Sequence, residues 1–131
     1  MNKNSFIAIT ILILGVFGFI FIFGFKTNNN GNSVLVENSE IKDGIQYITI
    51  NAGGGYSPRI SSAKAGIPTK LIMKTDGIYD CSTSLVIRSV GFQKILPQTG
   101  ETEIDIAIPK VGVPLQGVCS MGMYSFSVNF N

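Results

Sequence analysis

The sequence predicts an all-β domain, folded as a Greek-key β-sandwich or barrel and preceded by one N-terminal transmembrane helix. Three observations carry this prediction. Residues 6–25 form an uncharged apolar run, residues 45–131 contain several segments with a two-residue hydrophobic period, and no segment after residue 26 has a helical period over a useful length. The 131 residues therefore divide into a membrane anchor at 1–26, a flexible linker at 27–44 and a β domain at 45–131.

The apolar run, FIAITILILGVFGFIFIFGF, has the length that a helix needs to cross a hydrocarbon layer of about 30 Å. A cleaved signal peptide is the alternative, but its apolar region usually runs for only about 7 to 15 residues and ends in a small-residue cleavage motif. Lys3 and Lys26 flank the run, so the charges that set orientation are nearly balanced. The short N-terminal tail is typical of a signal anchor, which predicts a single-pass protein of the cell membrane with its domain on the extracytoplasmic side.

The linker begins with TNNNGNS at residues 27–33, a polar tract that cannot bury enough apolar surface to fold. We expect it to extend to about Gly44. The strands that follow are clearest in TEIDIAI (102–108) and YSFSVNF (124–130), where apolar and polar residues alternate. Further strands are expected at IQYITI (45–50), TKLIMKT (69–75) and LVIRSV (85–90), because turn residues separate them. The expected core consists of Tyr47, Ile48, Ile50, Leu71, Met73, Val86, Ile104, Ile106, Val118, Phe126 and Val128.

Composition argues against several classes of function. The net charge of +2 comes from scattered lysines and arginines, without the basic run that a nucleic-acid-binding face would need. Histidine is absent, which removes the usual general base and the commonest zinc and copper ligand. The hydroxyls of Ser82, Thr83 and Ser84 have no base to activate them, so we expect no enzyme here.

The chemistry of the domain is concentrated in its sulfur atoms. Cys119, Met121 and Met123 lie within five residues, and Cys81 lies in a separate segment. Outside the cytosol two cysteines can form a disulfide, which stabilises a small domain by about 3 to 4 kcal/mol on the chain-entropy model. A disulfide leaves the methionines unexplained, although methionine also fills gaps in cores. Thiolates with thioethers and no imidazole select soft ions, Cu(I) first and then Ag(I).

Five stretches of the β domain resemble the cupredoxin family, specifically its bacterial extracytoplasmic branch, whose last loop reads Cys-x-Met-Gly-Met. These stretches are GGGYSPRI (53–60), AGIPTKL (65–71), YDCSTSLVI (79–87), KILPQTGETEIDI (94–106) and CSMGMYSFSV (119–128). The resemblance covers residues 45–131.

The resemblance implies a ligand set of Cys81, Cys119, Met121 and Met123. Cys81 occupies the position of the upstream histidine of a blue-copper domain, Cys119 that of the last-loop cysteine and Met123 that of the methionine. The last-loop histidine has no counterpart unless Met121 replaces it, as a fourth or alternative ligand. Without histidine, the trigonal His₂Cys plane of an electron carrier cannot form. The resemblance therefore implies Cu(I) binding for copper trafficking, storage or tolerance, with a membrane metal transporter or metallochaperone as partner.

Two other functions remain open from the sequence. The domain can be a structural or interaction module whose cysteines form a disulfide, with incidental metal affinity. It can also be an electron-transfer cupredoxin, which would show a strong visible thiolate-to-Cu(II) band in its oxidised form.

Overall fold

The computed structural model describes residues 11–13 and 38–131. Residues 11–13 are helical and belong to a unit separate from residues 33–131. No helix among the described residues is both long and apolar enough to cross a membrane. Apart from residues 11–13, the transmembrane helix expected at 6–25 lies outside the described residues, as does the linker up to residue 37.

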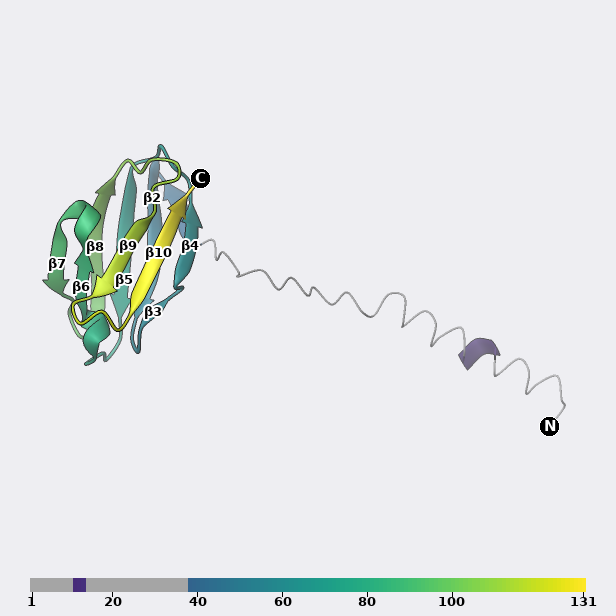
Figure 1. Ribbon diagram of the computed structural model, residues 1–131. Coiled ribbons are helices and arrows are strands. Elements are labelled where there is room, and N and C mark those ends of the chain that lie inside the picture. The colour runs from purple at the N-terminus through teal and green to yellow at the C-terminus, as the bar shows by residue number, and fades with distance from the viewer. Residues whose placement is uncertain (1–10, 14–37) are drawn as a thin grey trace. The chain divides into compact units, whose positions relative to one another are not determined.

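The domain consists of two five-stranded sheets (Figure 1). The first has the order β1-β2-β5-β8, with β3 also paired to β2, and its strands are β1 (Ser39–Lys42), β2 (Ile45–Ala52), β3 (Tyr56–Ser57), β5 (Thr69–Thr75) and β8 (Gly100–Ala107). The second has the order β4-β10-β9-β6-β7, with β4 (Ile60–Ala63), β10 (Ser125–Phe130), β9 (Leu115–Cys119), β6 (Ser84–Ile87) and β7 (Phe92–Ile95). Two 3₁₀ turns, η1 (Cys81–Thr83) and η2 (Arg88–Val90), flank β6. The prediction of an all-β domain is confirmed for the described residues.

Most strand pairs are antiparallel, but each sheet contains one parallel pair. β2 runs parallel to β5, and β10 runs parallel to β4. β9 pairs antiparallel with both β10 and β6. Its C-terminal end, at Cys119, lies beside the start of β6, at Leu85. This arrangement brings the segments that contain the two cysteines to one pole of the sandwich.

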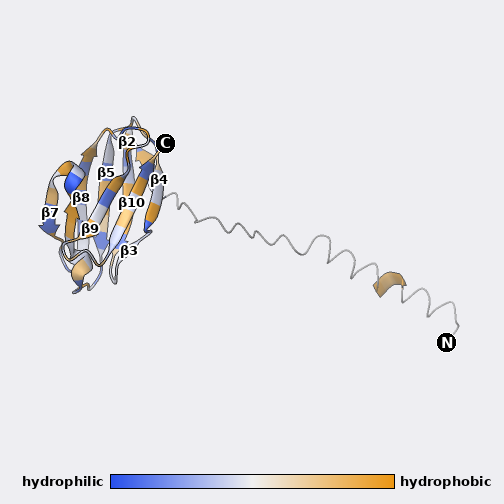
Figure 2. Ribbon diagram, in the orientation of Figure 1, coloured by the Kyte–Doolittle hydropathy of each residue, from blue (hydrophilic) through white to orange (hydrophobic). Residues whose placement is uncertain are grey.

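The core lies between the two sheets and follows the period of two that the sequence shows. Apolar residues alternate with polar ones along the strands (Figure 2). Eight of the expected core residues are buried: Ile48, Ile50, Leu71, Met73, Ile104, Ile106, Phe126 and Val128. Tyr47, Val86 and Val118 are only half-buried, and their place in the core was predicted wrongly.

The physical reason is strand phase. Neighbouring residues of a strand point to opposite faces, so Tyr47 and Ile48 cannot both point inward. In β6 the three consecutive apolar residues LVI do not indicate which of them point inward. The structure buries Leu85 and Ile87 instead of Val86.

Element boundaries also differ from expectation in two places. The first strand, β1, lies within the range expected for the linker, because residues 39–42 pair with β2. The strand expected at 85–90 ends at Ile87 and continues as the turn η2, which closes with Gly91 in the left-handed region at φ 64°.

Candidate metal centre

Cys81 begins the turn η1, and the local sequence explains why the turn starts there. Asp80 is the N-cap, since its Oδ1 accepts hydrogen bonds from the backbone N–H of Ser82 at 2.7 Å and from the Ser82 hydroxyl. The carbonyl oxygen of Asp80 also accepts from the Thr83 hydroxyl at 2.9 Å. Cys81 is thereby held at a fixed position, with its side chain half-buried.

Asp80 also joins this turn to the glycine loop of the other sheet. Its Oδ2 accepts a hydrogen bond from the backbone N–H of Gly54 at 2.7 Å, in the loop that connects β2 and β3. The hydrogen bonds from the hydroxyl and N–H of Ser82 and from the N–H of Gly54 hold the pKa of Asp80 below its ordinary value. Asp80 is therefore an ionised capping residue at the edge of the site.

Cys119 ends β9, and the loop to β10 folds around its sulfur. Gly122 adopts the left-handed conformation at φ 74°, and its N–H donates to the Cys119 carbonyl at 2.8 Å. This bend turns the N–H groups of Met123 and Tyr124 toward the Cys119 Sγ, at 3.2 and 3.4 Å. The Cys119 side chain is 1% exposed. The loop thus surrounds a buried sulfur with backbone donors, which is a favourable environment for a thiolate.

The two cysteines influence each other's ionisation. Both are free, and the neighbouring Cys119 raises the pKa of the Cys81 thiol, which desolvation raises further. Burial alone would raise the pKa of Cys119, but hydrogen bonds from Cys81 and from the N–H groups of Tyr124, Met123 and Met121 outweigh burial and lower it. The pair therefore holds its first negative charge on Cys119 and keeps a proton on Cys81.

The two methionines contribute to the site through their backbone, while their side chains are exposed. The N–H of Met123 donates to the Cys119 sulfur, and the backbone N–H of Met121 favours the thiolate form of both cysteines. Their side chains are 75% and 63% exposed, so the thioethers lie at the surface of the pole. The structure brings Cys81 and Cys119 together with the loop that contains Met121 and Met123.

Tyr56 is a buried part of this site that the sulfur pattern did not reveal. Its hydroxyl donates to the carbonyl oxygen of Ser82 at 3.0 Å, and its ring stands edge-on to Phe126, with centroids 5.1 Å apart. Burial raises the pKa of Tyr56 far above its ordinary range, and negative charge on Cys119, Cys81 and Asp80 raises it further. Tyr56 therefore stays a neutral donor beneath the two cysteines.

A second link joins the two cysteine segments at the surface. Ser120, next to Cys119, donates its backbone N–H to the Ser84 carbonyl at 2.8 Å, and the two hydroxyls are hydrogen-bonded at 2.8 Å. Ser84 follows η1 directly. The pairing of β6 with β9 brings these two serines together, so the contact could not be predicted from the local sequence.

The donor set fits a soft monovalent ion. Two adjacent sulfurs, one of them favoured as thiolate, suit a low-coordinate site for a soft metal, and exposed thioethers next to them are ligands of the same class. Within the described residues, no group of three or more thiol and carboxylate side chains is placed to hold a metal ion.

Comparison with known proteins finds structural neighbours. No protein-family model matches the chain, and no curated protein matches it significantly. One neighbour is a copper binding protein solved by NMR in its apo form, with a TM-score of 0.63 and 22% identity over 71% of this chain and 94% of that chain. Another is the metal-binding domain of the Cu(I)-exporting P-type ATPase of Streptococcus pneumoniae D39, crystallised with Cu(I), with a TM-score of 0.63 and 22% identity over 72% of this chain and 94% of that chain. The chain shares the fold of these two domains.

Proposed function

We propose that this protein binds one Cu(I) ion through the sulfurs of Cys81 and Cys119, with Met123 and Met121 as further ligands. The observation that carries the proposal is the placement of two free cysteines in neighbouring segments at one pole of the sandwich, with the buried Cys119 sulfur accepting hydrogen bonds from two backbone N–H groups. The fold shared with copper-binding domains supports the same chemistry. The domain is then a cupredoxin-like, Greek-key β-sandwich in which sulfur replaces imidazole.

Cu(I) binding by this pair requires the loss of the remaining proton. Cys119 is the first thiol to ionise, and a positive ion at the pair favours deprotonation of Cys81 as well. The backbone donors then stabilise the sulfur charge that the metal does not neutralise. Redox cycling to Cu(II) is disfavoured, because Cu(II) prefers nitrogen and oxygen ligands and the chain has no histidine.

The exposed thioethers suit a protein that receives and passes on copper. Met121 and Met123 lie at the surface beside a buried thiolate, and the three rotatable bonds of methionine allow each thioether to turn inward. An incoming ion would meet the thioethers first and the thiols second. We assign the protein to copper trafficking, storage or tolerance, anchored by residues 6–25 on the extracytoplasmic side of the cell membrane and working with a membrane metal transporter or metallochaperone.

The neighbouring positions of the two cysteine segments also favour a second candidate, a structural module in which Cys81 and Cys119 form a disulfide. The two functions predict different states of the cysteines in the cell. Alkylation followed by mass spectrometry, on protein taken from its own membrane, distinguishes them: a pair that is oxidised under every growth condition supports the disulfide module.

The direct test is anaerobic titration of the full-length, reduced chain in detergent micelles with Cu(I), against a chromophoric competitor. We expect one tightly bound ion, a loss of at least about 100-fold in affinity for Cys81→Ser or Cys119→Ser, and about three- to tenfold for Met121→Leu or Met123→Leu. Met73→Leu is the matched control, because Met73 is buried in the core. Tight binding that survives in the double cysteine variant would overturn the proposal.

A further inference from the structure

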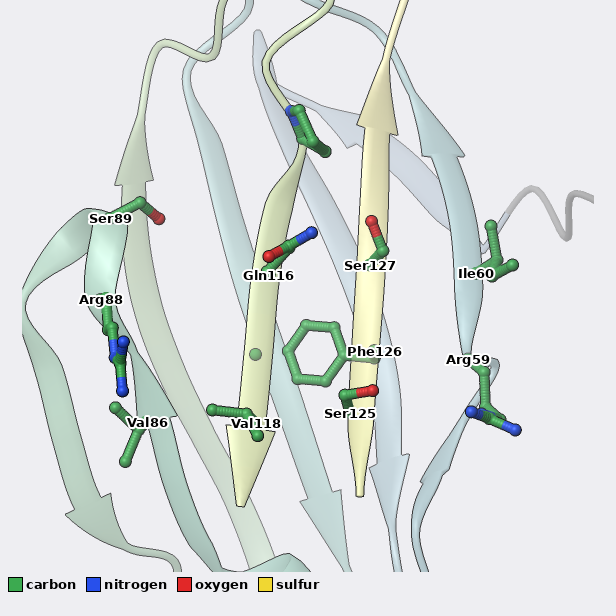
Figure 3. A pocket seen from close by; sticks show the side chains of 12 residues that line it. Arg59, Ile60, Val86, Arg88, Ser89, Gln116, Val118, Ser125, Phe126 and Ser127 are labelled. Carbon is green, nitrogen blue, oxygen red and sulfur yellow. The ribbon is translucent and has the colours of Figure 1, made fainter. Parts of the chain in front are cut away.

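A hollow of the described domain lies on the outer face of the β4-β10-β9-β6-β7 sheet, away from the sulfur atoms. It is a groove of about 900 Å³ over β10, β9 and β6 (Figure 3). Its floor contains Val86 and Val118, which are cross-strand partners, and Gly117, which has no side chain. Gln116, Ser125 and Ser127 add hydrogen-bonding groups along the same surface. A groove of this size falls within the range of ligand-binding sites, about 300 to 1,000 Å³.

The two sides of the groove are positively charged. Arg59 lies just before β4 and Arg88 lies in η2, on opposite sides of the floor (Figure 3). Both side chains are exposed, and neither forms an ion pair with another described residue. The strands β4 to β6 are separated by three inter-strand steps, about 14 Å at the usual spacing.

Charge is distributed unequally between the two sheets. The strands β4, β10, β9, β6 and β7 contain no aspartate or glutamate. The described ion pairs, Lys42–Glu40, Lys70–Glu103 and Lys74–Glu101, all lie on the other sheet, where lysines and carboxylates neutralise each other. The grooved face therefore keeps an uncompensated positive potential, which attracts an anionic partner.

We propose that this groove binds an extended acidic segment of a partner protein. Two carboxylates on the same face of an extended chain, four residues apart, are separated by about 13 Å, close to the separation of β4 and β6, the strands next to which the two arginines lie. An apolar residue midway between them would cover Val86 and Val118, and Arg59 and Arg88 would each bind one carboxylate. The backbone of the segment would meet Gln116 and the serine hydroxyls.

The shape of the groove favours a protein segment over a lipid surface. A flat membrane would contact the sides and leave the apolar floor uncovered, whereas an extended chain fills the hollow. The groove also leads to the sulfur pole: Val118 precedes Cys119, and Arg59 also lines a smaller cavity of about 400 Å³ with Met123 and Tyr124. A bound segment would place its own protein beside the Cys119 loop. The proposal does not depend on copper binding, and it is tested on the metal-free protein.

The experiment measures fluorescence anisotropy of a labelled nine-residue peptide, Glu-Thr-Val-Thr-Glu-Thr-Val-Thr-Glu, against the full-length apoprotein in maltoside micelles. We expect saturable binding that weakens as salt is added. Arg59→Gln and Arg88→Gln should each weaken binding at least about threefold, and the double variant at least about tenfold. Lys94→Gln is the matched control, because Lys94 is an exposed cation of the same sheet outside the groove.

Each of the following outcomes would overturn the proposal. The first is equal weakening by Lys94→Gln, which would show a response to net charge alone. The second is equal binding of the peptide with lysine in place of glutamate, or no binding of the acidic peptide at millimolar protein. The third is loss of peptide binding when phosphatidylglycerol is added to the micelles at a fixed ionic strength, which would assign the face to an anionic lipid surface.

Discussion

The hydroxyl of Tyr56 donates a hydrogen bond to the carbonyl oxygen of Ser82 across 3.0 Å, directly beneath the segment that begins with Cys81. The ring of the same tyrosine meets Phe126 edge-on, at an interplanar angle of 74°. Phe126 lies in β10, which follows the Cys119 loop. Tyr56 therefore connects the two cysteine segments through the interior of the domain.

Tyr56→Phe should weaken both the fold and the site. The variant leaves the buried Ser82 carbonyl without its donor, which we expect to lower the free energy of unfolding by about 1–2 kcal/mol. Because the turn that begins with Cys81 is then less fixed, Cu(I) affinity should fall by roughly tenfold. Chemical denaturation and competitive Cu(I) titration measure the two effects. Tyr79→Phe, at a residue that is 80% exposed, should change neither; a loss of stability with full Cu(I) affinity would restrict Tyr56 to a structural role.

The pH dependence of stability should also depend on Tyr56. Its pKa is raised in the folded state by burial and by negative charge on Cys119, Cys81 and Asp80. The resulting stabilisation is fully present below the ordinary tyrosine pKa of about 10 and is lost as pH rises above it, because the unfolded chain releases its proton first. Urea unfolding between about pH 9 and 11 should show a fall in stability that is shallower in Tyr56→Phe. Parallel curves for the two proteins would contradict the assignment.

Asp80→Ala should impair copper binding through the position of Cys81. The carboxylate caps η1 and reaches the Gly54 N–H, and both contacts are lost in the variant. We expect Cu(I) affinity to fall by roughly tenfold. Asp76→Ala, at another exposed loop aspartate, is the control and should bind Cu(I) normally. Equal affinities of the two variants would show that the cap does not position the thiol.

Gly117→Ala should destabilise the sandwich by overpacking. A Cβ atom at this position would lie 2.2 Å from Cε1 of Phe126, whose ring covers the glycine from the neighbouring strand. The ring is buried against Tyr56 and has little room to move, so we expect a loss of about 1–3 kcal/mol in the free energy of unfolding. Phe126→Leu in the same chain should recover part of that loss. The double-mutant cycle fails to support this contact if the two losses simply add.

The order in which the thiols ionise can be read from thiolate absorbance near 240 nm as a function of pH. Cys81→Ala removes a hydrogen bond that lowers the pKa of Cys119, so the remaining thiolate should appear at higher pH. Cys119→Ala removes the partner that raises the pKa of Cys81. In this variant the Cys81 thiolate should therefore form at a lower pH than it does in the native protein. Unchanged titration in both variants would mean that the thiols do not interact.

Strands with a clear period of two could be predicted closely from the sequence. The strand expected at 69–75 is β5 to the residue, and those expected at 102–108 and 124–130 differ from β8 and β10 by one or two residues at their ends. The short strands β3, β4 and β7 were not predicted, because two to four residues are too few to show a period. Their positions depend on partners that are distant in the chain.

The candidate site shows the same division. Sulfur chemistry identifies Cys81 and Cys119 from the sequence, because cysteine is rare in this chain and two methionines stand beside one of them. In the structure Asp80, directly before Cys81, caps η1. The Tyr56 hydrogen bond and the Ser84–Ser120 link are absent from any sequence pattern, since each joins residues more than twenty positions apart.

In the loop after Cys119, the main chain and the side chains have different roles. The groups that hold the sulfur are the N–H groups of residues 123 and 124, and any amino acid except proline supplies them. The side chains at 121 and 123 are therefore free to vary while the thiolate stays in place. Substitutions at these two positions can change the number and softness of the side-chain ligands at the surface. The preference among metal ions can therefore change while the backbone and Gly122 keep the conformation of the loop.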